Sequence, residues 1–287
     1  MSILVRLLGP VEVRRDDIVT PIGSSKRRTM LASLALTANR PVSLDTLIEA
    51  LWSDEAPSSA TKNLRNHAHA LRALLGERVV THPAAYELCL ATDELDVTRF
   101  LALADRGADA YAADEAVTAA AAYREALALW RGEPAPGVPR TAALSAIVAG
   151  LLDRRLSVFE GYCDAKLASG ASGELVPDLR QHLVRHPFRE HAWGTLMLAQ
   201  YRSGDLPGAL RSYAQARTGL RRDLGVDPGP DLVNLHRAIL SRDPCLDPPH
   251  RGARPSPPAS VRWPGGRRSG GHQQSEAASM DAVAQAG

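Results

Sequence analysis

A set of residues that recurs 34 positions apart limits the fold of the second half of this 287-residue chain more than any other feature. Phe159 and Gly170 stand 34 residues before Trp193 and Gly204. A period of this length is typical of helix pairs that stack side by side, because one pair alone cannot bury its apolar face. The spacing therefore predicts an all-helical region from Asp96 to about Asp243.

The residue types at the repeated positions are those of a tetratricopeptide unit, in which small side chains let neighbouring helices approach closely. A weaker copy around Tyr123 is not separated by 34 residues, so we expect an inserted turn or helix near Gly132–Arg140. The positions that match the unit in the last copy are Trp193, Leu196, Gly204, Ala209, Tyr213 and Ala216.

Residues 1–95 have a different pattern, which mixes short strands with helices. Alternating apolar residues around the Gly9-Pro10 turn and over 18–22 predict N-terminal strands. Three helical stretches follow, after Ser24 or Ser25, after Ser43 and after Ser59, and the last of them ends at Gly76. Residues 78–90 then predict a hairpin. Strands, three helices and a terminal hairpin together indicate a winged helix.

The predicted fold class is thus mostly α with a small α+β domain. We expect a winged-helix DNA-binding domain over 1–95, tetratricopeptide-like helices over 96–243, and a disordered tail over 244–287, where Pro, Gly, Ser and Arg replace aliphatic residues. No run approaches the roughly 18 uncharged residues of a membrane-spanning helix. These features favour a soluble, cytoplasmic and nucleoid-associated protein with no membrane partner.

The third predicted helix carries the residues that most directly indicate a function. Lys62, Arg65, Asn66 and His69 share the face opposite its leucines. Arg and Asn make paired hydrogen bonds to guanine and adenine in the major groove, while Lys engages phosphate. A polar helix face often contacts only water, but flanking cations favour DNA here. These flanking residues are Lys26, Arg27, Arg28, Arg72, Arg78 and His82.

Candidate enzyme and metal sites are weaker. His182 and His186 lie four residues apart, but Leu183 stands where a zinc-protease helix would have Glu. Cys163 has no evident His partner and is expected to be a small buried residue. We therefore expect no enzyme activity, no catalytic residue, no metal and no cofactor.

Several stretches make residues 1–243 resemble the Streptomyces antibiotic regulatory protein family, in its small form with an OmpR-like winged helix and a bacterial transcriptional activation domain. The most specific is Leu224-Gly225-Val226-Asp227-Pro228-Gly229-Pro230, which leads into Leu235-His236-Arg237-Ala238-Ile239-Leu240. The others are 7–13, Lys26-Arg27-Arg28 with its Leu-rich helix, 38–43 and Ala50-Leu51-Trp52.

The resemblance implies an activator of antibiotic or secondary-metabolite genes that binds direct repeats in promoter double-stranded DNA, self-associates there and recruits RNA polymerase holoenzyme. It makes the third helix the recognition helix, residues 78–90 the wing, and Asp54 and Glu55 a polymerase contact. Larger relatives continue into an ATPase domain, but this sequence has no glycine-rich loop followed by Lys-Ser or Lys-Thr, so no nucleotide hydrolysis is expected. The alternatives are a tetratricopeptide-type protein-interaction adaptor and a repressor that does not recruit polymerase.

Overall fold

The chain begins with an antiparallel sheet in the order β1-β2-β3, formed by β1 (Ile3–Arg6), β2 (Glu12–Arg15) and β3 (Ile18–Thr20). The computed structural model describes residues 2–52 and 55–247, and all structural statements concern these residues. Asp16 and Asp17, both at positive φ, make the tight turn between β2 and β3. The predicted N-terminal strands are thus confirmed.

Three helices follow this sheet in the chain and contact one another: α1 (Ser25–Leu36), α2 (Leu44–Trp52) and α3 (Ala60–Leu75). The Ser24 hydroxyl accepts a hydrogen bond from the amide of Arg27 and so caps α1. The three helices begin after Ser24, Ser43 and Ser59, as the sequence predicts, and α3 ends at Gly76, whose φ is +69°.

A second sheet follows α3 and contains the predicted hairpin. Strands β5 (Val79–His82) and β6 (Ala85–Leu88) pair antiparallel, and β4 (Val42–Ser43) pairs with β6 on its other side. Asn39, at φ +63°, binds this sheet region from the end of α1, because its side-chain amide exchanges hydrogen bonds with the backbone of Leu90. The sheet order β4-β6-β5 leaves β5 at the edge beside α3.

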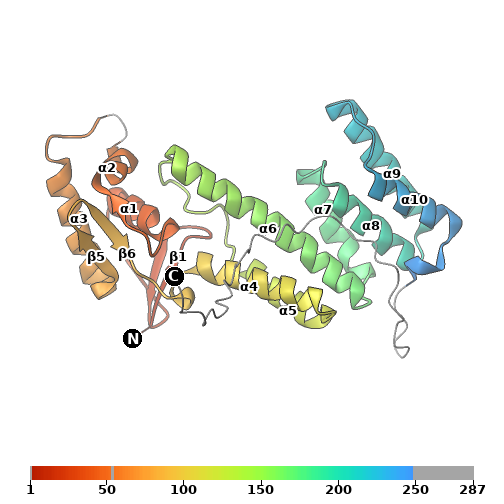
Figure 1. Ribbon diagram of the computed structural model, residues 1–287, viewed down its shortest axis with the longest axis horizontal. Helices are drawn as coiled ribbons and strands as arrows, with labels where there is room; N and C mark the ends of the chain where they lie inside the picture. The colour runs from red at the N-terminus through yellow and green to blue at the C-terminus, as the bar shows by residue number, and fades with distance from the viewer. Residues whose placement is uncertain (1, 53–54, 248–287) are drawn as a thin grey trace, which may run out of the picture. The chain divides into compact units, whose positions relative to one another are not determined.

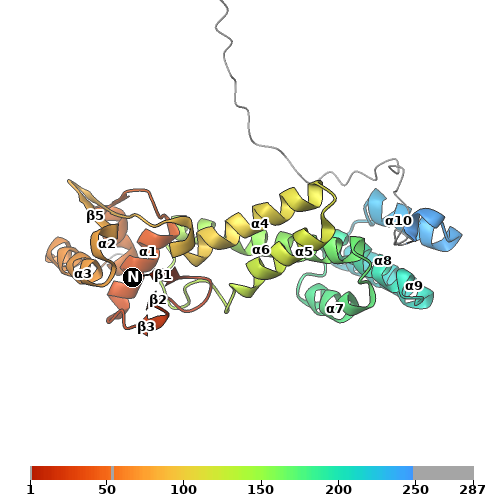
Figure 2. The same cartoon turned by 90° about the horizontal axis from the view of Figure 1, so that it is seen from below.

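From Asp96 onward the regular elements are helical, as predicted (Figures 1 and 2). No helix among the described residues is long and apolar enough to cross a membrane. Short 3-10 turns occur at Gly76–Arg78, Thr92–Glu94, Gly173–Leu175 and Pro244–Leu246, and a π turn at Leu220–Leu224. The helices are α4 (Asp96–Ala112), α5 (Ala116–Ala128), α6 (Ala142–Ala168), α7 (Val176–Arg185), α8 (Glu190–Arg202), α9 (Leu206–Gly219) and α10 (Pro230–Ser241).

Two sequence expectations need correction in detail. The repeat copy that starts near Phe159 does not have a first helix of its own, because that residue lies inside the 27-residue helix α6. Residues 244–247, which the sequence assigns to the disordered tail, are ordered, since Leu246 is 8% exposed and its carbonyl oxygen accepts a hydrogen bond from Arg202. Residues 248–287 lie outside the described residues.

The first sheet and helices α4–α6 share one hydrophobic core, which runs from Ile3 to Ala165. Asp96 is 1% exposed and its carboxylate accepts hydrogen bonds from the amides of Leu7 and Leu8 at 2.8–3.0 Å. The loop before α6 adds a second connection, because the amide of Arg131 donates to the Leu8 carbonyl oxygen and its guanidinium lies 2.9 Å from Glu12. We call this set the Asp96–Arg131 contact.

Candidate nucleic-acid interface

Helix α3 has one buried face and one exposed face, as the sequence predicts. The exposed face carries Lys62, Arg65, Asn66 and His69, followed by Ala73. Neither an ion pair nor a side-chain hydrogen bond to another described residue ties any of the first four side chains. Their donors and acceptors are therefore free for a ligand. The buried residues of the helix are Ala60, Leu64, Ala68, Leu71, Leu74 and Leu75.

The start of α3 adds positive potential to this face. Ser59 precedes the helix but makes no side-chain capping bond, and the first turn contains no acidic residue. Amides in the first turn of a helix point along the axis and carry a partial positive charge, which attracts phosphate. Lys62 lies in this turn, so its charge and the helix end reinforce one another.

Arg72, another predicted DNA contact, has a different position in the structure. Its guanidinium is half-buried and donates to the carbonyl oxygen of Val79 at 3.1–3.2 Å and to the hydroxyl of Thr81 at 2.7 Å. These bonds join the last turn of α3 to the edge strand β5. Arg72 thus connects α3 to the hairpin.

The two predicted hairpin residues also pair within the chain. Arg78 forms an ion pair with Glu94, and its Nε lies 3.1 Å from both carboxylate oxygens. The hydrogen bond with Glu94 raises the pKa of Arg78. Nε2 of His82 lies 2.7 Å from Glu87 across the hairpin. Arg78 and His82 are therefore each paired with a carboxylate of the chain.

The three cations at the start of α1 have two different surroundings. Lys26 and Arg27 bind backbone carbonyl oxygens, whereas Arg28 lies beside residues 136–138. Lys26 donates to the carbonyl oxygen of Leu51 and lies 4.5 Å from the centre of the Trp52 ring. Arg27 donates to the Ile22 carbonyl oxygen.

Both cations lie near α3. Burial lowers the pKa of His67 on that helix, and the charges of Arg27 and Lys26 lower it further. Arg28 instead lines a hollow of about 180 Å³ beside residues 136–138.

The predicted polymerase contact is only partly within the described residues. Glu55 is exposed between α2 and α3, whereas Asp54 lies outside them. An exposed carboxylate in this loop is open to a protein partner.

The His182 region contains an ion-pair cluster. Among the described residues, no group of three or more His, Cys, Asp or Glu side chains is arranged to hold a metal ion. The ring of His182 stacks on Phe159 and lies 3.6 Å from Glu160, which Arg189 binds through two hydrogen bonds of 2.7 Å. Cys163 is buried as expected, and burial raises the pKa of its thiol.

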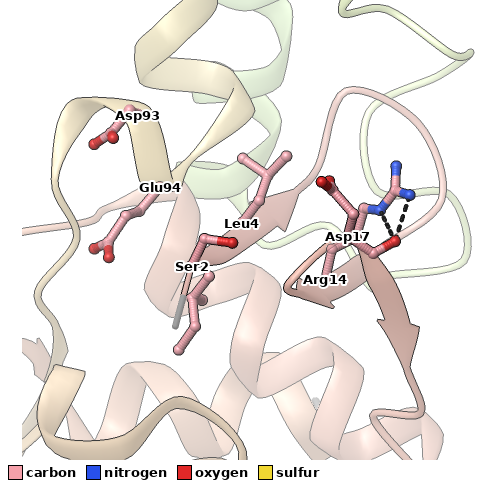
Figure 3. Close-up of a pocket in the computed structure, with 7 residues that line it drawn as sticks. Ser2, Leu4, Arg14, Asp17, Asp93 and Glu94 are labelled. Atoms are coloured by element: carbon pink, nitrogen blue, oxygen red, sulfur yellow. Dashed lines mark hydrogen bonds between the residues drawn. The ribbon is translucent and has the colours of Figure 1, made fainter.

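A pocket of about 210 Å³ on the first sheet has the wrong charge for DNA (Figure 3). Asp17, Asp93 and Glu94 line it, together with a single cation, Arg14. The guanidinium of Arg14 donates to the Asp17 carbonyl oxygen, as the dashed lines in Figure 3 show. We assign this pocket no role in nucleic-acid binding.

Sequence reasoning missed Asp96 and Arg131, which connect the first sheet to the helical region. The sequence feature that could have indicated this connection is Gly9. Its φ is +150°, and it has no room for a side chain, because a Cβ there would lie 2.8 Å from the Cβ of Arg131. A glycine next to a proline indicates a turn, but the sequence does not show which distant residue approaches it.

Comparison with known proteins agrees with this architecture. Residues 95–240 match the family model described as the bacterial transcriptional activator domain. The chain is 33% identical over 245 residues to the transcriptional regulatory protein EmbR of Mycobacterium tuberculosis, covering 83% of this chain and 63% of EmbR. It is 39% identical over 242 residues to the regulatory protein AfsR of Streptomyces coelicolor, covering 84% of this chain and 24% of AfsR.

Other relatives match over more of their length. The regulatory protein DnrI of Streptomyces peucetius is 32% identical over 256 residues, which cover 85% of this chain and 94% of DnrI. A solved structure of M. tuberculosis EmbR in complex with a low-affinity phosphopeptide superimposes with a TM-score of 0.80 at 31% identity, covering 84% of this chain and 66% of that chain. The chain therefore belongs to the Streptomyces antibiotic regulatory protein family.

Proposed function

We propose that the chain is a sequence-specific activator that binds promoter double-stranded DNA with the exposed face of α3 in the major groove. The observation that carries this proposal is the set of four untethered side chains on that face: Lys62, Arg65, Asn66 and His69. Arg65 and Asn66 supply the paired donors and acceptors that distinguish bases, and Lys62 supplies charge for phosphate. The buried leucines on the opposite face fix the orientation of the helix.

The hairpin β5–β6 acts as the wing in this proposal. Arg72 joins α3 to β5, so the helix and the hairpin would contact DNA at a fixed separation. Lys26 and Arg27 lie near the same helix and would add to the positive potential. Arg78 and His82 would contribute less, because Glu94 and Glu87 already pair with them. Arg28 lines the hollow beside residues 136–138, so it would contact only a phosphate that approaches that side of the chain.

The helical region completes the proposed mechanism. We assign DNA binding to residues 1–95 and activation to residues 96–243, with protomers on adjacent direct repeats and RNA polymerase holoenzyme recruited beside them. Glu55, with Asp54, is the proposed polymerase contact. Membership of the family supports control of antibiotic or secondary-metabolite genes.

Selection of bound duplexes from a random pool tests DNA recognition directly. The full chain should enrich a motif that occurs twice in the same orientation, and binding to it should weaken steeply as salt rises. Absence of any enriched motif would contradict the proposal and favour an adaptor whose helical repeats bind protein.

Transcription from a promoter that contains the enriched motif then separates activation from repression. Purified RNA polymerase holoenzyme should give more transcript when the chain is present, and Glu55→Gln should reduce this gain even at chain concentrations that saturate the DNA site. A decrease in transcript with the wild-type chain would instead identify a repressor.

A further inference from the structure

A groove between α7, α8 and α9 has no part in the proposed DNA contact. It has a volume of about 330 Å³ and presents one face of each helix. We call it the α7–α9 groove. The residues that line it are Arg180, Leu183 and Val184 of α7, Trp193, Leu196 and Gln200 of α8, and Gly208, Arg211, Ser212 and Gln215 of α9.

The groove has an apolar centre that is open to a partner. Trp193 and Leu196 of α8 line it, together with Val184 of α7, of which 83% is exposed. An apolar side chain as exposed as Val184 gains free energy when a partner covers it. The eight residues from Trp193 to Gln200 span roughly 10 Å, which corresponds to about two turns of a helix laid alongside.

The residues that line the groove carry charge of one sign, because they include the cations Arg180 and Arg211 and no carboxylate. The carboxylate of Asp205 lies next to this lining, where it accepts a hydrogen bond of 2.8 Å from the amide of Gly208 and approaches Arg211 only to 4.0 Å. The side chain of Arg211 is 68% exposed, so most of its donors remain available. A partner with carboxylates that approach both arginines would therefore bind better than a neutral or basic one.

A buried amide also lines the groove. Gln200 is 1% exposed, and its Oε1 accepts a hydrogen bond of 2.8 Å from the Ser212 hydroxyl. This bond joins α8 to α9, two of the three helices that line the groove.

We propose that the α7–α9 groove is a docking site for a short amphipathic helix of a partner protein, with apolar residues on one face and carboxylates beside them. Apolar side chains of the segment would cover Val184 and Trp193, and its carboxylates would pair with Arg180 and Arg211. Insertion of such a helix into a groove is a common mode of peptide recognition. The site goes beyond DNA binding, because none of its residues belongs to α3 or to the hairpin.

A synthetic peptide provides the test. The probe is a fluorescein-labelled helical peptide of about 14 residues, with leucines spaced three and four apart and glutamates on either side of them. Its control carries lysine in place of every glutamate. Fluorescence anisotropy with the full chain should show saturable binding of the glutamate peptide and at least about tenfold weaker binding of the lysine peptide.

Substitutions locate the binding. Val184→Asp should weaken binding of the glutamate peptide at least about tenfold, and the double variant Arg180→Glu/Arg211→Glu should reverse the preference toward the lysine peptide. Val117→Asp is the matched control, because Val117 is 73% exposed on α5 and lies outside the groove. These substitutions are at exposed positions, and thermal melts should show that each variant folds.

Three outcomes would overturn the proposal. The first is no saturable binding of the glutamate peptide, and the second is equal binding of both peptides by every variant. The third is a wild-type oligomer that Val184→Asp dissociates in sedimentation, which would make a second copy of the chain the occupant. Unchanged duplex affinity of Val184→Asp would keep this result independent of the DNA-binding proposal.

Discussion

Arginines on or near α3 differ in what their guanidinium groups already bind. Arg65 has no hydrogen-bond or ion-pair partner among the described residues, whereas Arg72 donates to two groups of the hairpin and Arg78 pairs with Glu94. A guanidinium whose donors are taken must break those bonds before it can contact a base or a phosphate. The free residues are therefore the ones whose removal should change DNA binding most directly.

Substitution of two free residues should separate base contact from phosphate contact. Arg65→Ala should weaken binding to the selected site by about 1–3 kcal/mol while changing binding to a scrambled duplex less. Lys62→Ala should weaken both and reduce the slope of log affinity against log salt by about one. Titrations at several salt concentrations measure both effects. Arg106→Ala, at an exposed position of α4, is the control, and equal losses on both duplexes for Arg65→Ala would contradict its base-contacting role.

Glu160 shows how neighbours determine the charge of a buried group. Burial alone would raise the pKa of this carboxyl, but His182 at 3.6 Å and Arg189 at 2.7 Å outweigh that effect and lower its pKa to about 2 from an ordinary value of 4.5. A lowered pKa in the folded state stabilises the fold above the ordinary value, and this contribution is lost as the pH falls toward 2.

Glu160→Gln should therefore flatten the dependence of stability on pH. The free energy of unfolding in urea should fall by about 2 kcal/mol less in the variant than in the wild type as the pH drops from about 4.5 to 2. Glu174→Gln is the control, because Glu174 is exposed and pairs only with Lys166. Parallel curves for the wild type and Glu160→Gln would show that the ion pair contributes nothing in this range.

At the scale of elements, local sequence signals predicted α1–α3 and the hairpin well. The caps at Ser24 and Ser43 and the turn at Gly76 act within a few residues, so their effects can be derived from sequence. The exposed face of α3 also followed from periodicity alone. The bonds of Arg78 and Asp96 did not, because their partners lie 16 and 88–89 residues away. The fusion of the first repeat helix into α6 was missed because a repeat fixes spacing but not where a helix begins.

Helices α4, α5 and α6 pack around Tyr123. A Cβ at Gly107 of α4 would lie 2.6 Å from the Tyr123 ring, and one at Gly161 of α6 would lie 3.0 Å from it. The ring thus occupies the space left by two glycines. This close contact explains why small residues occur in the middle of these helices, where glycine itself lowers helix stability.

Gly107→Ala should destabilise the chain by about 1–3 kcal/mol, because the ring cannot move without disturbing α6. Gly150→Ala is the matched control in α6, where nothing lies within 4 Å, and should stabilise by about 0.5–1 kcal/mol through helix propensity. Urea denaturation of both variants measures the two changes. A stabilising effect of Gly107→Ala would show that α4 and α5 move apart at little cost.

At the scale of the whole molecule, the cores do not divide at residue 95. One core extends from the first sheet to Ala165. Two further hydrophobic clusters are formed by residues from the end of α6 and from the elements that follow it. Val97, Phe100 and Trp130 belong to the first core, although the sequence assigned them to the second domain. Residues 1–95 therefore lack part of the core that they need.

Two fragments of the chain, residues 1–95 and residues 1–168, should differ in whether they unfold cooperatively. Residues 1–95 alone should give no cooperative urea transition by near-ultraviolet circular dichroism, because Val5, Leu7 and Leu8 would lose apolar neighbours and the carboxylate of Asp96. Residues 1–168 keep the first core and should unfold cooperatively. A stable, cooperative 1–95 fragment would contradict the shared core and support two independent domains.

The Asp96–Arg131 contact also has a consequence for promoter architecture. This contact joins the first sheet to α4 and the loop before α6, and the buried leucines of α3 belong to the same hydrophobic core. A protomer bound through α3 would therefore hold its helical region in a fixed direction from the DNA axis. Half a helical turn is about five base pairs, so moving one direct repeat by that distance would place the neighbouring protomer on the opposite side of the duplex. Rotational phase between repeats, and not only their separation, would then decide whether two protomers meet.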